Sequence, residues 1–439
     1  MTDEAISTFS GFALGRRPAI EEARPMGFVP KPDARAVFAG KAGDMIVDDG
    51  DGHALVLAPT GAGKKRNVLA ATLLKARNPA IVLDVKGELA RETAAHRRDV
   101  LGHEVRILDP WRIATDTPDS FNPLDLLNPE GPEFGDDAYA LARLLQDTAP
   151  LKEAYWDEGA QSVVSGLIAH VASGSGETDR SFGRVWDLGN ADDVTYGLAV
   201  LLDTQKVHPF ARAQIAGLLA LSADNTRSCV LSVMQQHLRV FSSDAVKAAV
   251  ATTSFDLDAV REGRPLTIYV CVPLAKLHSH AALLRMWLGA LMDLILARTQ
   301  APPLPTLMLL DEVGQLGRMD QVLQAVTLAR GFGLRCMLLL QSLAALRRAY
   351  PADHEVLLEN CGAVLTFGHG SFGMSRQMSE MLGDVSADRL FAMGHGQAAL
   401  RLSGRRTQIV DRLDYLNDPD LVGLAAPDRM ASGGAAARG

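Results

Sequence analysis

The chain has 439 residues, 47% of them hydrophobic, which is enough to bury two or three cores. Its formal net charge is −8, which argues against a surface that is basic throughout. The four cysteines contain no C-x-x-C pair, so the sequence predicts reduced thiols in a cytosolic protein and argues against a zinc site.

The sequence predicts neither a secretory signal nor a membrane-spanning segment. The first residues lack the basic and apolar regions of a secretory signal. The longest mainly apolar stretch, Leu283 to Ala297, has 15 residues and contains Arg285 and Asp293, whereas a span needs about 18. Residues 1–40 are predicted to be an irregular segment, and residues 426–439 a disordered tail.

The first apolar run, Ala54–Ala58, continues into a turn rich in glycine and then into a helical pattern. This order predicts a phosphate-binding loop. Gly61 and Gly63 can take positive φ, so the backbone N–H groups of the turn can surround an anion. The positive end of the dipole of the following helix points at the same place. Lys64 would reach the β- and γ-phosphates. The predicted nucleotide-binding residues are Pro59, Thr60, Gly61, Ala62, Gly63, Lys64 and Lys65.

Two positions depart from the usual loop pattern. Ala58 stands where the first glycine is expected, and Lys65 replaces the hydroxyl residue that holds Mg²⁺. The sequence therefore supports nucleotide binding more strongly than hydrolysis. Lys64, Lys65 and Arg66 would each be disfavoured by about 0.3–1 kcal/mol at a helix N-terminus without an anion. A bound polyphosphate would supply one.

A second apolar run, Thr306–Leu310, ends in Asp311 and Glu312 and is typical of a buried parallel strand. Ligands of open parallel sheets gather at the carboxyl ends of strands, so both acids are expected near Lys64. Asp311 is the predicted Mg²⁺ ligand, and Glu312 would orient and activate the attacking water. The alternative is a pair of solvated acids that open a loop.

Further apolar runs alternate with helical patterns and predict an α/β fold with a mostly parallel central sheet. Residues 131–251 interrupt this alternation with helical periodicity and predict an inserted all-alpha domain. The nucleotide-binding domain would comprise residues 41–130 and 252–425. Two short runs, Gln397–Leu402 and Thr407–Val410, predict a hairpin. The other predicted strands are Ala80–Leu83, Val105–Leu108, Leu266–Val272, Cys336–Leu340 and Val364–Phe367.

The chain resembles the coupling proteins of type IV secretion and bacterial conjugation. Besides the loop and Asp311-Glu312, the resemblance rests on six segments, which are Leu83-Asp84-Val85-Lys86-Gly87-Glu88-Leu89, Phe121-Asn122-Pro123-Leu124-Asp125, Tyr155-Trp156-Asp157-Glu158, Thr226 to Ser232, Ala329 to Arg335 and Leu340-Gln341-Ser342. It implies a RecA-like P-loop ATPase core that uses ATP and Mg²⁺, an all-alpha domain at the mouth of a ring, and a homohexamer.

The resemblance also implies roles for single residues. Arg330 looks like the arginine finger that reaches a neighbouring subunit's γ-phosphate, although it could instead cap the preceding helix. Gln341 resembles the γ-phosphate sensor, and its alternative role is to bond nearby backbone. Asp84, Lys86 and Glu88 would shape the nucleotide pocket or a subunit contact.

These features predict an ATP-driven motor that delivers DNA, a nucleoprotein or a protein to a type IV secretion or conjugation channel. Family members usually begin with transmembrane helices, and this chain shows none, so we expect a truncated, soluble or docked form recruited to the inner membrane by a partner. Two alternatives stay open. One is an adaptor that binds ATP without hydrolysing it, and the other is a soluble DNA-pumping or helicase-type motor.

Overall fold

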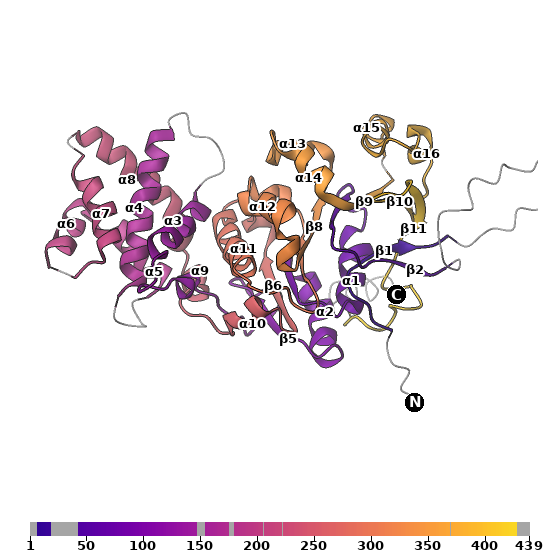
Figure 1. Cartoon of the computed structure of the whole chain (residues 1–439), viewed down its shortest axis with the longest axis horizontal. Helices are drawn as coiled ribbons and strands as arrows, with labels where there is room; N and C mark the ends of the chain where they lie inside the picture. Colours follow the sequence, from indigo (N-terminus) through magenta and orange to yellow (C-terminus); the bar gives the residue numbers. More distant parts are fainter. Residues whose placement is uncertain are drawn as a thin grey trace, which may run out of the picture.

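A computed structural model describes residues 7–18, 43–146, 154–174, 180–204, 206–221, 223–368 and 370–427 of the protein. A large sheet with helices on both faces forms the core, and a lobe of helices extends from one end of it (Figure 1). The strands β1, β2 and β11 lie at the end of the sheet away from that lobe (Figure 1).

The sheet has 11 strands in the order β2-β1-β11-β10-β9-β3-β8-β7-β4-β6-β5. From β9 to β5 neighbouring strands are parallel, whereas the pairs from β9 to β2 are antiparallel. The strands are β1 (Phe12–Arg16), β2 (Met45–Asp48), β3 (His53–Leu57), β4 (Ala80–Val85), β5 (Glu104–Leu108), β6 (Leu266–Val272), β7 (Thr306–Leu310), β8 (Leu334–Leu340), β9 (Cys361–Phe367), β10 (Gln397–Leu402) and β11 (Gln408–Asp411). The predicted α/β class, the parallel strands and the hairpin are confirmed.

Alternate residues of the central strands face two separate cores, as the period of a strand requires. On β3, Leu55 and Leu57 belong to one core, while Ala54 and Val56 belong to the other. The second core is closed by α1 and α2, and the first by α11, α12 and α13. The core helices are α1 (Ala70–Lys75), α2 (Glu88–Asp99), α10 (Leu257–Glu262), α11 (Ala281–Leu296), α12 (Asp320–Leu328), α13 (Leu343–Ala349), α14 (His354–Asn360), α15 (Phe372–Leu382) and α16 (Ala387–Phe391).

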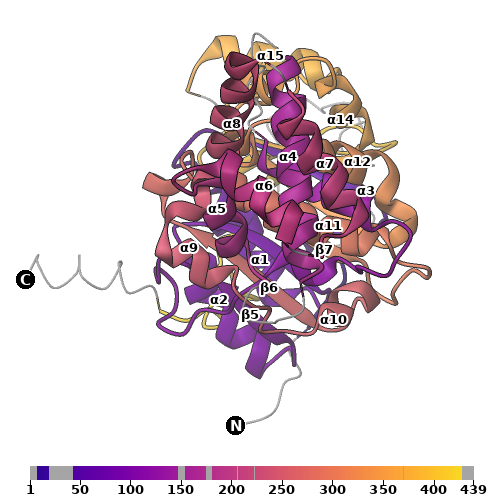
Figure 2. The same ribbon diagram turned by 90° about the vertical axis from the view of Figure 1, so that its left-hand side faces the viewer.

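The helical lobe is inserted between β5 and β6. Its central helix buries Val163, Val164, Leu167 and Ile168, which explains the helical periodicity of the sequence. Figure 2 shows the lobe in front of the sheet, and its apolar core is continuous with the core on the α11 side. The helices are α3 (Phe134–Leu145), α4 (Ala154–Ala172), α5 (Phe182–Gly189), α6 (Val194–Thr204), α7 (Pro209–Leu219), α8 (Asp224–Leu238) and α9 (Asp244–Ala249).

The N-terminal segment differs from the expectation of irregular structure. Within residues 1–40, β1 forms a strand that pairs with β2 and with β11. Neither β1 nor β2 has a long apolar run of its own, and the pairing partner β11 lies almost at the other end of the chain. Residues 1–6 and 19–40 lie outside the described residues.

The expected C-terminal tail, residues 426–439, also begins differently. Ala426 donates its backbone N–H to the Glu92 carbonyl, so the chain is still attached to α2 at this point. Residues 428–439 lie outside the described residues. Among the helices that the structure describes, none combines the length and the apolar character needed to cross a bilayer.

Candidate nucleotide-binding and catalytic site

The predicted phosphate-binding loop joins the carboxyl end of β3 to a helix. Gly61 and Gly63 have φ values of 76° and 86°, the left-handed region that glycine enters without strain. A Cβ atom at Gly63 would lie 2.6 Å from Asn67 Oδ1, so a larger residue would displace that side chain. The helix begins with a π-helical turn, Lys65–Leu69, before α1. Such turns are frequent at functional sites.

The loop and the end of β7 are joined by Lys64. Its side chain is 6% exposed, and its ammonium group donates to the Ala58 carbonyl at 2.8 Å. The same nitrogen lies 3.3 Å from Glu312 Oε1. Gln341, directly after β8, donates its amide to Glu312 Oε2 at 3.0 Å. The structure thus brings Lys64, Glu312 and Gln341 together at one edge of the sheet, as expected.

Glu312 has a strained backbone conformation. Its φ of 54° is in the left-handed region, which costs a residue with a Cβ atom about 1–3 kcal/mol. A short 3-10 turn, Val313–Leu316 (η7), starts immediately after it. Lys64 and Gln341 hold the carboxylate that follows from this backbone position.

Asp311 lies beside a second buried acid. Leu83 on β4 pairs with Leu310 on β7, so Asp84 and Asp311 follow at adjacent strand positions. Burial, together with the neighbouring carboxylates of Glu312 and Asp84, raises the pKa of Asp311 to about 7. Burial also raises the pKa of Asp84 to about 6.

This pair of carboxyl groups fits a divalent cation. Asp84 Oδ2 accepts the Ala90 N–H at 2.8 Å, but Oδ1 is buried and has no hydrogen-bond partner among the described residues. Mg²⁺ prefers carboxylate oxygens and water, and it would favour the ionised form that burial disfavours. Asp311 and Asp84 are therefore the residues that could hold Mg²⁺.

Lys65, which the sequence predicts to contact the nucleotide, has carboxylate partners within the chain. Its ammonium group pairs with Glu88 of α2 and lies 3.9 Å from Glu92 Oε1. Arg66 likewise forms a bidentate pair with Asp414. The positive charges at this helix N-terminus are thus met by carboxylates of the chain itself, which supply anions in addition to the polyphosphate that we expected.

Arg330 lies at the amino ends of the parallel strands, opposite the end that carries the phosphate-binding loop. It belongs to a 3-10 turn, Ala329–Phe332 (η8), that precedes β8, and its guanidinium donates to the Asn360 carbonyl at 3.3 Å. Its charge contributes to lowering the pKa of His53, the first residue of β3. The phosphate-binding loop follows the last residue of that strand. The five-residue strand separates them by about 16 Å, so Arg330 does not reach the site of its own chain.

The sequence analysis missed the contacts that the C-terminal segment makes with the loop. Arg412, just after β11, donates to the Ala62 carbonyl at 2.8 Å and stacks over the Phe367 ring at 4.6 Å. Asn67 donates to the Leu413 carbonyl. These partners lie about 350 positions from the loop, and no local pattern marks them.

Comparison with known proteins identifies relatives across most of the chain. A model of the family described as Type IV secretory system Conjugative DNA transfer matches residues 21–389. Protein VirD4 of Rhizobium rhizogenes is 26% identical over 391 residues, covering 87% of this chain and 56% of the relative. The conjugal transfer protein TraG of Agrobacterium fabrum is 26% identical over 351 residues, covering 77% and 52%. The chain thus spans about half the length of these curated relatives.

The fold also matches a solved structure. The plasmid coupling protein TrwB, in complex with the GTP analogue GDPNP, superposes with a TM-score of 0.64. The match covers 84% of this chain and 88% of that protein at 16% sequence identity. The core is therefore an α/β P-loop NTPase fold of the TrwB type.

Proposed function

The chain belongs to the Type IV secretory system Conjugative DNA transfer family, and we propose that it is an ATP-driven coupling motor. In this proposal it delivers DNA, or a nucleoprotein or protein substrate, to a type IV secretion or conjugation channel. One observation carries the proposal. The carboxylate of Glu312 is held between Lys64 of the phosphate-binding loop and Gln341 of the neighbouring strand end.

The loop residues have separate roles in the proposed site. The backbone N–H groups of Thr60 to Gly63 bind phosphate oxygens, and Lys64 moves from Glu312 to the β- and γ-phosphates when ATP enters. Glu312, then free of the lysine, accepts a proton from the attacking water. Gln341 contacts the γ-phosphate and senses whether it is present. Bound nucleotide is known for the TrwB fold, which has also been solved with ADP and Mg²⁺.

Mg²⁺ would be held by Asp311, with Asp84 beside it. When bound, the cation would stabilise the charge that develops on the phosphate oxygens during transfer. Because Lys65 cannot coordinate a cation, these two carboxylates replace the hydroxyl that usually follows the loop lysine. The buried Asp84 oxygen that lacks a hydrogen-bond partner supports this assignment.

Arg330 acts in a neighbouring subunit in this proposal. The sheet separates it from the phosphate-binding loop of its own chain, so it can stabilise a transferring phosphate only where another copy presents its site. A homohexamer meets that requirement if the nucleotide site of each subunit faces Arg330 of the next subunit. The proposed further partners are components of the secretion or conjugation system, through which the motor contacts the inner membrane from the cytoplasmic side.

A second function is favoured by the ion pair between Lys65 and Glu88. If the metal is bound too weakly without a hydroxyl ligand, the chain would bind ATP but not hydrolyse it. It would then serve as an adaptor that recruits substrate to an active relative.

ATP binding and turnover together separate these functions. We would measure both with Mg²⁺, with and without single- and double-stranded DNA, in the wild type and in Glu312→Gln. A motor shows turnover that DNA increases and that the variant lacks. An adaptor binds ATP and shows no turnover under any of these conditions, which would overturn the motor proposal.

A further inference from the structure

Three consecutive residues after β11 each hold a different group of the phosphate-binding loop or of the helical turn that follows it. The contacts are those of Arg412 with the Ala62 carbonyl, of the Leu413 carbonyl with the Asn67 amide, and of the Asp414 carboxylate with the Arg66 guanidinium. We call residues 412–414 the strap. The strap lies about 350 positions from the loop in the sequence, so the fold alone brings the two together.

The strap is anchored to the sheet. The Arg412 N–H donates to the Gly396 carbonyl at 2.7 Å, and the Leu413 side chain is fully buried in the core that α1 and α2 close. A few residues further on, the Asp418 carboxylate accepts a hydrogen bond from Arg16 of β1 at 2.6 Å. The strap therefore holds the loop from a fixed position.

The guanidinium group of Arg412 is enclosed. Its Cζ atom lies 4.6 Å from the centroid of the Phe367 ring, which belongs to the last residue of β9 and is buried. Its Nε is also buried and has no hydrogen-bond partner among the described residues. The ring on one side and the Ala62 carbonyl at the end together fix the orientation of the planar guanidinium.

The bond to Ala62 fixes a peptide group that a glycine would otherwise leave free to turn. The Ala62 carbonyl and the Gly63 N–H belong to one planar trans peptide, so they point in opposite directions. Gly63 has a φ of 86°, and glycine changes its backbone conformation at little steric cost. Because Arg412 holds the carbonyl, the N–H points away from the strap. That N–H makes no hydrogen bond within the part of the chain that the structure describes.

We propose that Arg412 is a positioning residue for the phosphates of the bound nucleotide. By holding the Ala62 carbonyl, it keeps the Gly63 N–H turned towards the phosphate oxygens as one of the backbone donors of the loop. In this role Arg412 acts through the loop and needs no contact with the nucleotide. The inference rests on the nucleotide site of the proposed function, but neither on hydrolysis nor on DNA.

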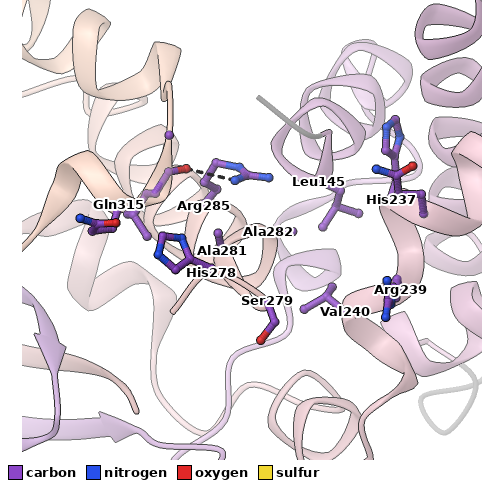
Figure 3. Close-up of a pocket in the computed structure, with 13 residues that line it drawn as sticks. Leu145, His237, Arg239, Val240, His278, Ser279, Ala281, Ala282, Arg285 and Gln315 are labelled. Carbon is purple, nitrogen blue, oxygen red and sulfur yellow. Dashed lines mark hydrogen bonds between the residues drawn. The ribbon is translucent and has the colours of Figure 1, made fainter. Parts of the chain in front are cut away.

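Other arginines of the chain also hold backbone carbonyls, but those carbonyls lie at helix ends. Arg285, which lines a cavity between the lobe and the core, donates to the Leu316 carbonyl at the end of η7 (Figure 3). Arg401 of β10 donates to the Met381 carbonyl near the end of α15 at 3.0 Å. Such carbonyls lack a partner within their own helix, so these bonds complete a helix end. Ala62 lies inside the loop, where the same kind of bond directs a phosphate donor.

Binding of ADP and of pyrophosphate to Arg412→Gln tests the proposal. Each ligand displaces a fluorescent ADP analogue from the purified full chain, which gives its Kd. Pyrophosphate has neither base nor sugar, so it reports on the phosphate-binding loop alone. A backbone N–H that donates to a charged phosphate contributes enough that its loss should weaken both ligands by the same factor, about tenfold to a hundredfold.

Arg401→Gln is the matched control, because it also removes an arginine that holds a backbone carbonyl, and it should leave both affinities unchanged. Thermal unfolding followed by circular dichroism shows whether each variant is folded. If Arg412→Gln does not fold, Arg412→Met replaces it, because the unbranched methionine side chain can still pack on the Phe367 ring. The ratio of wild-type to variant affinity should be the same at about 0.1 M and about 0.5 M salt, since a hydrogen bond is screened far less than a long-range attraction.

Three results would overturn the proposal. The first is an affinity of Arg412→Gln for both ligands within about twofold of the wild type. The second is a loss confined to ADP, which would indicate contact with the base or the sugar. The third is an affinity ratio that disappears at the higher salt concentration, which would indicate attraction by charge alone.

Failure of this inference can be distinguished from failure of the proposed function. If the wild type binds neither ADP nor pyrophosphate, the proposed nucleotide site fails, and the positioning role fails with it. If the wild type and Arg401→Gln bind both ligands and Arg412→Gln binds them equally well, only the positioning role fails.

Discussion

The ammonium group of Lys64 lies 3.3 Å from a carboxylate oxygen of Glu312, so the phosphate-binding lysine is paired with the proposed catalytic base. In the proposed mechanism, nucleotide entry breaks this pair, because Lys64 then contacts the β- and γ-phosphates. The pair thus couples phosphate binding to the release of Glu312, and the first two predictions follow from it.

Lys64→Ala should abolish nucleotide binding, because the β- and γ-phosphates lose the side-chain cation that is proposed to reach them. A fluorescent ATP analogue titrated against the purified variant measures this. The control variant Lys276→Ala changes an exposed lysine after β6 and should bind the ATP analogue as tightly as the wild type does. Undiminished binding by Lys64→Ala would contradict the assignment of the loop.

Glu312→Gln should keep or improve ATP binding and lower turnover by at least about a hundredfold, the usual loss when a general base is removed. The amide still accepts a hydrogen bond from Lys64 but cannot take the proton of water. Single-turnover hydrolysis, with the protein in excess over ATP, measures the chemical step. Turnover within a fewfold of the wild type would exclude Glu312 as the base.

Lys65→Thr should tighten the binding of divalent metal in the presence of nucleotide, because a hydroxyl ligand returns to the position that the ammonium now occupies. Electron paramagnetic resonance of Mn²⁺ titrated into the protein with a non-hydrolysable ATP analogue gives the affinity directly. The control, Glu88→Gln, breaks the same ion pair without adding a ligand. Equal affinity in Lys65→Thr and wild type would mean that the carboxylates alone hold the metal.

Arg330 should act between subunits. Neither Arg330→Ala nor Glu312→Gln should turn over ATP alone. A one-to-one mixture that forms rings should regain up to about one quarter of the wild-type rate, because some interfaces combine an intact Glu312 with an intact Arg330 from the neighbour. The rate of the mixture, measured after subunit exchange, checks this. A mixture as inactive as its components would argue against a finger in trans.

His53 should make the protein less stable in acid. Burial, together with the charges of Arg330 and Arg335, lowers the pKa of its ring to about 4. The ring is neutral in the fold, since Nδ1 accepts the Cys336 N–H at 3.0 Å. Unfolding lets it bind a proton below its ordinary pKa of 6.5, so stability is complete above that pH and falls towards pH 4.

The loss amounts to about 3 kcal/mol at pH 4. Urea unfolding between pH 4 and 7 should show a shallower pH dependence for His53→Asn than for the wild type. The exposed His395 is the matched control, and His395→Asn should follow the wild type. Parallel curves for His53→Asn and wild type would contradict the neutral buried ring.

The sequence predicted those features that local patterns encode. A buried parallel strand is a continuous apolar run, so β3 and β7 could be located, and the rule that ligands gather at carboxyl strand ends placed Lys64 near Glu312. The helical lobe followed from the spacing of residues such as Leu167 and Ile168, which the structure buries.

Features that depend on distant partners could not be predicted in the same way. β1 is a strand because β2 and β11 supply its hydrogen bonds, and its own five residues include a glycine. From the sequence, only the helix dipole could be considered when the charge of Lys65 was judged unfavourable. No local pattern shows that Glu88 of α2 pairs with it. The contact between Arg412 and the loop carbonyl of Ala62 is likewise a product of the folded chain.

The most direct test of the motor proposal is displacement of a third strand from a DNA triplex by the wild type, by Glu312→Gln and by Lys64→Ala, each with ATP and Mg²⁺. A motor that moves along DNA strips the third strand as it passes, so we predict displacement by the wild type at a rate set by ATP, and none by either variant. ATP turnover by the wild type without displacement of the strand would contradict movement along DNA.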